Sequence, residues 1–211
     1  MLIVSASWII ISAVRSLRPA DKSKTHPVTS MKILRICSVF FMLSVPACVQ
    51  AQWGKPESPI VPSADGYVTI PNVAFPPSNA HIYKAVWDAT KAAKEASMLV
   101  PALNMAASEL NAFGVARVPQ KNVKFVVVFH GAATNAILDD EHFKAKFGIS
   151  NPNLKAIEQM KNYGVEFYVC GQYLAGENID PKTLTPLVRV ASDALLVLIQ
   201  YQNNGYALMS F

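Results

Sequence analysis

The sequence predicts an α/β domain over residues 81–211, with helices on both faces of a mainly parallel, five-stranded sheet and therefore three layers. Residues 123–129 form a near-continuous, valine-rich apolar run, which is typical of a strand buried on both faces of a parallel sheet. A helical pattern and a second apolar run, at 165–170, follow with short connections. This order of strand, helix and strand predicts a right-handed parallel crossover.

The first strand of the sheet is expected at residues 82–88, where apolar side chains alternate with others. A helix over residues 84–96 fits the same stretch, and periodicity alone does not decide between the two. The next element is a helix that begins at Pro101, carries an apolar stripe as far as Phe113 and ends at Gly114.

Asn151 is expected to cap a helix that has Pro152 at its first position and that ends at Gly164. The strand at 165–170 follows directly, and residues 187–191 fit a fourth strand.

The last two elements are a helix and a closing strand. Ser192 is expected to cap a helix that runs to about Gln202, although the apolar run at 194–199 also has the composition of a strand. Residues 206–211 are expected to form the fifth strand.

Positive charge is concentrated at the N-terminus of the chain. Residues 1–51 hold six basic residues and one acidic residue, which account for the whole formal net charge of +5. The remaining residues, 52–211, hold 13 basic and 13 acidic residues. Nucleic-acid binding needs a basic face on the folded domain, so this charge distribution argues against a nucleic-acid partner.

Residues 31–51 have the pattern of a secretory signal peptide: a basic start, the apolar run 36–45 and a small-x-small cleavage site that ends at Ala51. Cleavage there predicts a periplasmic or secreted protein that begins at Gln52. The apolar run is far shorter than the roughly 20 residues that span a bilayer, so no stable membrane anchor is expected after cleavage. We interpret residues 1–30 as a non-native extension from an upstream start.

Residues 52–80 are rich in proline, which removes backbone donors and disfavours both helix and central strand. We expect an extended arm that lies on the domain or on a neighbouring subunit; a mobile linker fits the composition equally. Within this stretch, residues 67–70 have the composition of a short edge strand.

Several familiar motifs are missing. The chain has no GxGxxG or GxxxxGK[ST] phosphate loop, no GxSxG elbow and no CxxC pair. These absences argue against a nucleotide enzyme, a serine hydrolase and a dithiol oxidoreductase, and no cofactor is indicated. The acidic residues at 139–141 and the adjacent His142 are interpreted as helix N-terminal charges and not as a metal site.

Signal-peptide cleavage would leave Cys170 as the only cysteine of the mature chain. Such a thiol is buried and inert, paired between two chains, or reactive, and the sequence leaves the three readings open. Cys170 and His130 each stand at the carboxyl end of a predicted strand, where ligands of open α/β sheets bind. Because the two strands are consecutive, we expect both side chains on one rim.

Three stretches together resemble one known family, the DsrE/DsrF-like family, in its exported branch. The stretches are residues 126–131 with Asn135 following, residues 164–172 with the sequence GVEFYVCGQ, and residues 202–206 near the C-terminus. The resemblance covers about residues 80–211, and the Val-Cys-Gly run after a strand is its most specific part.

The resemblance implies a doubly wound α/β fold and a homo-oligomer that is a dimer, trimer or hexamer. It also implies that Cys170 carries sulfur as a persulfide, with a sulfur donor or acceptor protein as partner. His130, expected on the same rim, is the candidate residue that assists Cys170. The alternative is a non-catalytic small-ligand-binding or structural protein of the periplasm, and the sequence leaves open whether the protein is an enzyme. The candidate ligand-binding residues at the rim are Gly131, Asn135, Gly171 and Gln172.

Overall fold

The computed structural model describes residues 53–211; the predicted signal peptide and the predicted upstream extension lie outside them. Five strands form one sheet in the order β4-β3-β2-β1-β5, and every neighbouring pair is parallel. The strands are β1 (Tyr83–Ala89), β2 (Val123–Phe129), β3 (Glu166–Cys170), β4 (Arg189–Ala191) and β5 (Ala207–Ser210).

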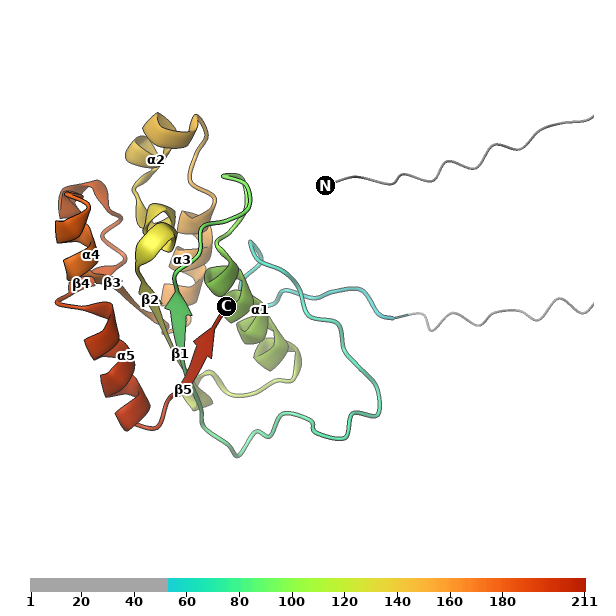
Figure 1. Cartoon of the computed structure of the whole chain (residues 1–211). Coiled ribbons are helices and arrows are strands. Elements are labelled where there is room, and N and C mark those ends of the chain that lie inside the picture. Colours follow the sequence, from blue (N-terminus) through green and yellow to red (C-terminus); the bar gives the residue numbers. More distant parts are fainter. Residues whose placement is uncertain (1–52) are drawn as a thin grey trace, which may run out of the picture. The chain divides into compact units, whose positions relative to one another are not determined.

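Helices cover both faces of the sheet (Figure 1), which confirms the predicted three-layer α/β fold. Within residues 53–211, no helix is both long enough and apolar enough to cross a membrane. The α-helices are α1 (Pro101–Val115), α2 (Asp140–Phe147), α3 (Asn153–Asn162), α4 (Gly171–Gly176) and α5 (Ala194–Asn203), and three 3-10 helices are η1 (Gln120–Asn122), η2 (Gly131–Ile137) and η3 (Pro181–Thr183).

The chain builds the sheet outward from β1 in two directions. From β1 to β4 each strand is added on the same side of its predecessor, and α1 and α3 pack on one face. Helix α5 then packs on the opposite face and leads to β5, which lies on the other side of β1. Right-handed crossovers in opposite directions require helices on opposite faces, which is the doubly wound arrangement.

Two hydrophobic cores lie between the three layers, one on each face of the sheet. The larger core joins α1 and α3 to the sheet side chains of that face, among them Trp87, Val127 and Phe167. The smaller core joins α5 to the other face through Val86, Val126, Val128 and Cys170 of the sheet and Ala194, Val197 and Leu198 of the helix. Strand residues therefore alternate between two buried surfaces, as the continuous apolar run at β2 predicts.

The structure shows which element forms in each of the two stretches for which the sequence fitted both a strand and a helix. Residues 83–89 form β1, and the helix over 84–96 is wrong, because β1 pairs on both sides and buries side chains on both faces. Residues 194–203 form helix α5, and the strand alternative there is wrong. Its cap is Asp193 and not Ser192, since Asp193 Oδ1 accepts the N–H of Leu195 at 3.3 Å.

Gly114 does not end α1, which continues to Val115. A Cβ atom at this position would lie 2.7 Å from Ile60 Cγ1 and 2.8 Å from Pro59 Cγ. Glycine is needed at position 114 because the proline-rich arm packs closely on the helix there, and not because the helix ends there.

Helix α3 begins at Asn153, two residues after its predicted cap. Pro152 and not Asn151 occupies the cap position, so the predicted start is one residue too early; Asn151 Oδ1 nevertheless accepts the N–H of Asn153, the first helical residue, at 3.0 Å. The Asn151 amide also donates to the carbonyls of Ala136 and Leu138, which ties α3 to the segment after β2. At the other end Gly164 adopts the left-handed conformation (φ +102°), as expected for a residue that follows a helix.

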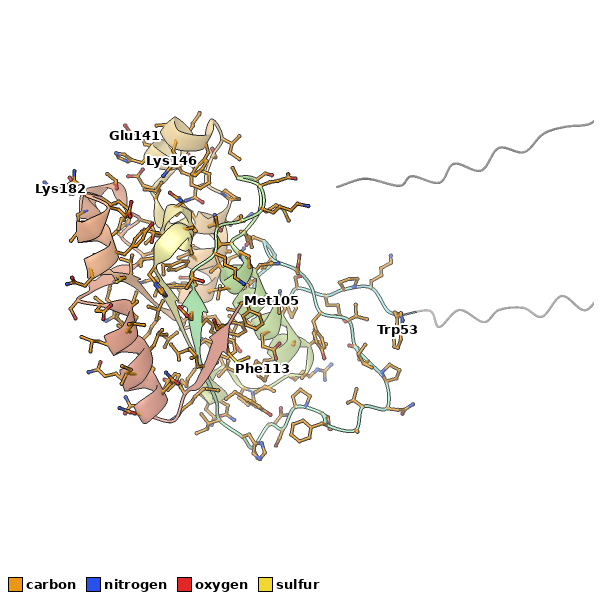
Figure 2. The ribbon with its side chains drawn as sticks, in the orientation of Figure 1. Trp53, Met105, Phe113, Glu141, Lys146 and Lys182 are labelled. Carbon is orange, nitrogen blue, oxygen red and sulfur yellow. The ribbon has the colours of Figure 1, made fainter. Side chains whose placement is uncertain are left out.

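The proline-rich arm lies against α1 of its own chain (Figure 2). Val61 is fully buried there, and Asn111 of α1 holds the arm backbone. Its Oδ1 accepts the N–H groups of Ile60 and Val61, and its Nδ2 donates to the carbonyls of Val61 and Asp65. The predicted edge strand at 67–70 does not form; the arm makes one isolated antiparallel bridge, between residues 57 and 67.

Replacement of Asn111 by alanine should lower the free energy of unfolding by about 2 to 4 kcal/mol, because two buried N–H groups lose their acceptor. Urea denaturation measures the change. Asn104→Ala is the matched control, since Asn104 also bonds the arm but does so at the exposed Asp65; its loss should be under about 1 kcal/mol. Equal losses in the two variants would contradict a buried role for Asn111.

Candidate functional site

The candidate site lies at the carboxyl ends of β1, β2 and β3, on the face that α5 covers. Phe129 pairs with Val169, so the same register sets His130, one residue later, opposite Cys170. Side chains alternate along a strand, and Cys170 shares the smaller core with α5. His130 and Cys170 therefore come to the same rim, as the sequence predicts, and also to the same face of the sheet.

Asp88 is the partner of His130 that sequence analysis missed. The Asp88 Oδ1 atom lies 2.6 Å from His130 Nε2, and the two side chains are only 17% and 26% exposed. An ionised carboxylate only accepts hydrogen bonds, so Nε2 carries the proton and Nδ1 of the neutral ring remains an acceptor. Alternation along β1, which puts Asp88 on the same face as Val86, was the signal that could have identified it.

The sulfur of Cys170 sits where two helices begin. Cys170 is 5% exposed and is the one free cysteine of the described residues. Its Sγ accepts the N–H of Tyr173 in the first turn of α4 at 3.4 Å, and it donates to Asp193 Oδ1 at 3.5 Å. Asp193 caps α5, so Cys170 ties the end of β3 to the starts of both helices.

Gly171 is required by the backbone that passes beside it. A Cβ atom there would lie 2.6 Å from the carbonyl oxygen of Ala191 and 3.3 Å from that of Ser192. Glycine thus lets the first turn of α4 approach the end of β4. Gln172, next in the chain, is exposed to solvent beside the buried sulfur. Ligand binding by Gly171 and Gln172 stays a prediction.

Gly131 and Asn135 lie on η2, the segment that follows β2. Gly131 has φ +58°, a conformation that glycine adopts without strain, and it turns the chain away from His130. Asn135 accepts a hydrogen bond from Lys146 Nζ at 2.8 Å and donates one to the carbonyl of Ala132. The structure does not bring Asn135 to Cys170: it lines a cavity together with Val100 and Phe143 of the larger core.

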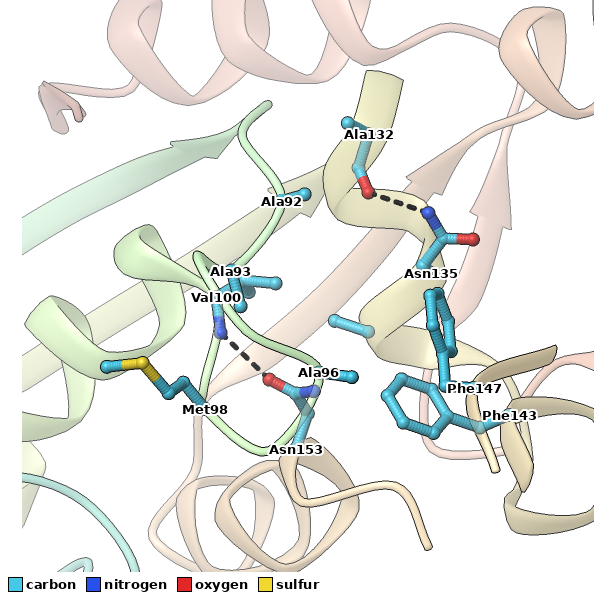
Figure 3. Close-up of a pocket in the computed structure, with 11 residues that line it drawn as sticks. Ala92, Ala93, Ala96, Met98, Val100, Ala132, Asn135, Phe143, Phe147 and Asn153 are labelled. Carbon is cyan, nitrogen blue, oxygen red and sulfur yellow. Dashed lines mark hydrogen bonds between the residues drawn. The ribbon is translucent and has the colours of Figure 1, made fainter. Parts of the chain in front are cut away.

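This cavity, of about 110 Å³, opens beside η2 (Figure 3). The rings of Phe143 and Phe147 from α2 form one wall, and alanines of the loop after β1 face them. Asn153 lines it too, but its Oδ1 is engaged with the N–H of Val100 at 3.0 Å. The lining is therefore mainly apolar, and the volume is of the order that holds a small apolar molecule.

A polar cluster at the opposite end of β3 stabilises the α5 layer. Arg189 of β4 donates to Glu166 and to the hydroxyl of Tyr168, and Tyr201 of α5 donates to Glu166 at 3.2 Å. Burial raises the pKa of Tyr201, and the hydrogen bond with Tyr168 and the Glu166 carboxylate raise it further. Tyr201 therefore stays a neutral donor, and the cluster is structural.

Asp139 caps α2, in agreement with the interpretation of the acidic residues as helix N-terminal charges. Its Oδ1 accepts the N–H of His142 at 2.8 Å, and this hydrogen bond, with that of the His142 ring, lowers the pKa of Asp139. Across residues 53–211, no three His, Cys, Asp or Glu side chains gather in a way that could hold a metal ion.

Gly171→Ala should lower the free energy of unfolding by about 1 to 3 kcal/mol, because the new methyl group meets a backbone carbonyl that cannot rotate away. Gly176→Ala in the same helix is the matched control: nothing lies within 4 Å of its Cβ position. Alanine at that position should change stability by under about 1 kcal/mol. Chemical denaturation compares them, and similar curves for the two variants would refute the close approach at Gly171.

Comparison with known proteins places this arrangement in a family. The DsrE/DsrF-like family model matches residues 80–211. Two solved structures each cover 61% of this chain and 99% of their own, at 17% identity: protein MTH1491 of unknown function from Methanobacterium thermoautotrophicum, with a TM-score of 0.44, and the ychN protein from E. coli, with a TM-score of 0.43. No curated protein matches the chain. The family match spans more than half of the sequence and the whole sheet, and the chain therefore belongs to the DsrE/DsrF-like family.

Proposed function

We propose that this protein is an exported sulfur carrier that holds sulfur as a persulfide on Cys170, with His130 as the assisting base. The observation that carries the proposal is the register of β2 and β3, which aligns His130 with Cys170 at the carboxyl ends of the strands. Membership of a family linked to sulfur relay supports it.

The transfer conserves atoms and electrons when the donor is itself a persulfide. The Cys170 thiolate attacks the outer sulfur of the donor, a sulfur–sulfur bond forms at Cys170, and the donor's own sulfur–sulfur bond breaks. The donor leaves as a thiol. The thiol, which donates to Asp193 before the reaction, gives its proton to Nδ1 of His130, which returns it to the leaving thiolate while Asp88 holds Nε2.

Burial limits what can reach the sulfur. Cys170 is nearly covered, whereas Gln172 in the first turn of α4 is exposed. We expect a donor to approach over this turn. Local movement of this turn would then expose the sulfur for exchange with a donor or with an acceptor thiol.

Export is the second part of the proposal. The signal-peptide pattern at 31–51 and the predicted cleavage after Ala51 support a periplasmic or secreted location. A mature chain with one cysteine forms no internal disulfide in such an oxidising compartment, so Cys170 would remain available for sulfur chemistry.

Assembly into a homo-oligomer is the third part. Helix α5 presents a row of apolar side chains outward: Leu195, Leu196 and Ile199 are each more than half exposed. Val190 of the edge strand β4 is exposed to a similar degree, and an open cavity of about 500 Å³ lies between the two elements. Exposed apolar patches of this kind mark protein–protein contacts, and a second copy of the chain is the partner that we propose.

A non-catalytic ligand-binding protein is the second candidate function. The mainly apolar cavity in Figure 3 and the burial of Cys170 favour it. In that case Cys170 would be a packing residue of the smaller core, and its replacement by serine would leave ligand binding and assembly unchanged.

The sulfur-carrier proposal predicts that the protein, treated with a small persulfide donor, gains the mass of one sulfur atom. A thiol added in excess should reverse the gain. Intact-mass spectrometry measures both steps. Cys170→Ser should show no gain, and His130→Gln should reach the same final mass more slowly, by about 10- to 100-fold, because only proton transfer is impaired. An unchanged wild-type mass, or a gain in mass that persists in Cys170→Ser, would contradict the proposal.

The assembly proposal predicts that Leu196→Lys lowers the mass seen in light scattering to that of a single chain, because a charge on the α5 face cannot be buried between copies. Met105→Lys is the matched control, since Met105 is a comparably exposed apolar residue on α1. It should leave the mass unchanged. A wild-type protein that is already monomeric, or a Leu196→Lys variant that keeps its oligomeric mass, would count against the α5 face.

A further inference from the structure

Hydrogen bonds join the walls of the cavity in Figure 3 to one another. The loop between β1 and α1 is tied to η2, because the N–H of Ala133 donates to the carbonyl of Thr90 at 3.1 Å. The same loop is tied to α3, because Asn153 Oδ1 accepts the N–H of Val100 at 3.0 Å. These hydrogen bonds fix the walls relative to one another, so the hollow of about 110 Å³ is a preformed feature of the fold. Protein interiors contain few voids larger than a water molecule, whereas ligand pockets are usually formed before the ligand binds.

The two polar side chains of the lining are engaged within the protein at both the oxygen and the nitrogen of their amides. Asn135 Oδ1 accepts a hydrogen bond from Lys146 Nζ at 2.8 Å, and Asn135 Nδ2 donates to the carbonyl of Ala132 at 3.1 Å. Asn153 Nδ2 donates to Asn151 Oδ1 at 3.0 Å. All other lining residues are alanine, valine, methionine or phenylalanine. A polar ligand would lose its water there without gaining new partners, so the lining favours an apolar ligand.

The apolar walls can be reached from solvent. Phe147, at the end of α2, is 37% exposed, and its ring centroid lies 4.6 Å from that of the buried Phe143. Figure 3 shows these two rings facing Ala93 and Ala96, which are half-buried residues of the loop after β1. A flat ring between the two walls would contact methyl groups on one side and an aromatic ring on the other, and aromatic rings pair favourably at centroid distances of about 4.5 to 7 Å.

We propose that this cavity binds a small aromatic molecule of a single ring. An engineered apolar cavity of about 150 Å³ in another protein holds benzene, and the volume here is of the same order. Contact with Phe147 and with the alanine methyl groups would hold the ring without a hydrogen bond. This ligand class rests on the ligand-binding candidate function, and the site uses no property of Cys170.

Isothermal titration of the wild-type protein with benzene, with cyclohexane and with acetamide tests the ligand class. Saturable binding of one benzene per chain is expected, together with a concentration-dependent rise in Tm. Cyclohexane should bind about 3- to 10-fold more weakly, because it has no aromatic face, and acetamide should show no saturable binding. Cys170→Ser should bind benzene as the wild type does.

Absence of saturable benzene binding would overturn the proposal, as would cyclohexane binding that equals or exceeds that of benzene. Saturable binding of acetamide in place of benzene would also overturn it, yet would leave the ligand-binding function standing. Loss of benzene binding in Cys170→Ser would contradict a site that is independent of the thiol. The gain of one sulfur on Cys170 is measured separately, so neither experiment decides the other.

A variant that fills the cavity locates the binding. Ala96→Leu should weaken benzene binding by about tenfold or more, because the added carbons take the place of the ligand, and it should keep or raise the Tm measured without benzene. Ala145→Leu is the matched control, since Ala145 is an exposed alanine of α2 outside the lining. It should bind benzene as the wild type does. The same affinity in the two variants would place the binding elsewhere and overturn the proposal.

A second variant removes the accessible aromatic wall. Phe147→Ala should weaken benzene binding by about tenfold, because the ring that faces the ligand is lost. Ile149→Ala is its control, since Ile149 is a comparably exposed apolar residue outside the lining. Neither residue is buried, so both variants should fold, and this pair decides the matter even where Ala96→Leu packs poorly. Benzene affinity that is unchanged in Phe147→Ala would contradict the site.

Discussion

The parallel pairing of β1, β2 and β3 is the interaction on which the rest of the structure depends. Its register sets the carboxyl ends of three strands at one edge, and it brings together residues that are separated by up to 82 positions in the chain, from Asp88 to Cys170. Alternation along each strand then selects the face. His130 has its partner Asp88 on the neighbouring strand, 42 positions away in the chain, and it acquires this partner only through the pairing.

The same edge carries two different environments because the sheet separates them. The α5 side carries an Asp–His pair and a buried thiol. On the α1 and α3 side, η2 and α2 enclose cavities beside Asn135, one mainly apolar and one lined by Lys146. Both environments require glycine where the backbone turns or approaches closely, at Gly131 and Gly171. The sheet thus separates the Asp–His pair and the thiol from the cavities beside Asn135.

The sequence was sufficient for those features that local patterning determines. The apolar run at β2 and the helix signals around Asn151 and Gly164 predicted the fold. Burial of a strand on both faces and the conformation at the ends of a helix both depend on residues that are close together in the sequence. Asp88 was missed, since alternation along β1 gives only its face, whereas its partner His130 comes from the end of the neighbouring strand. Gly114 was interpreted as a helix stop because its real cause, contact with the arm, is a long-range one. The burial of Cys170 depends on α5 and was equally beyond local patterns.

The most direct test of the account is whether the Cys170 thiol reacts from the folded state. The alkylation rate of Cys170 should be measured in the native wild-type protein and in a variant destabilised elsewhere, in increasing low concentrations of urea. A sulfur reached through local movement of the first turn of α4 predicts a rate that is nearly the same in both proteins and nearly independent of urea. A rate that rises with urea and with the loss of stability would show that Cys170 reacts only after global unfolding, and would contradict a carrier role.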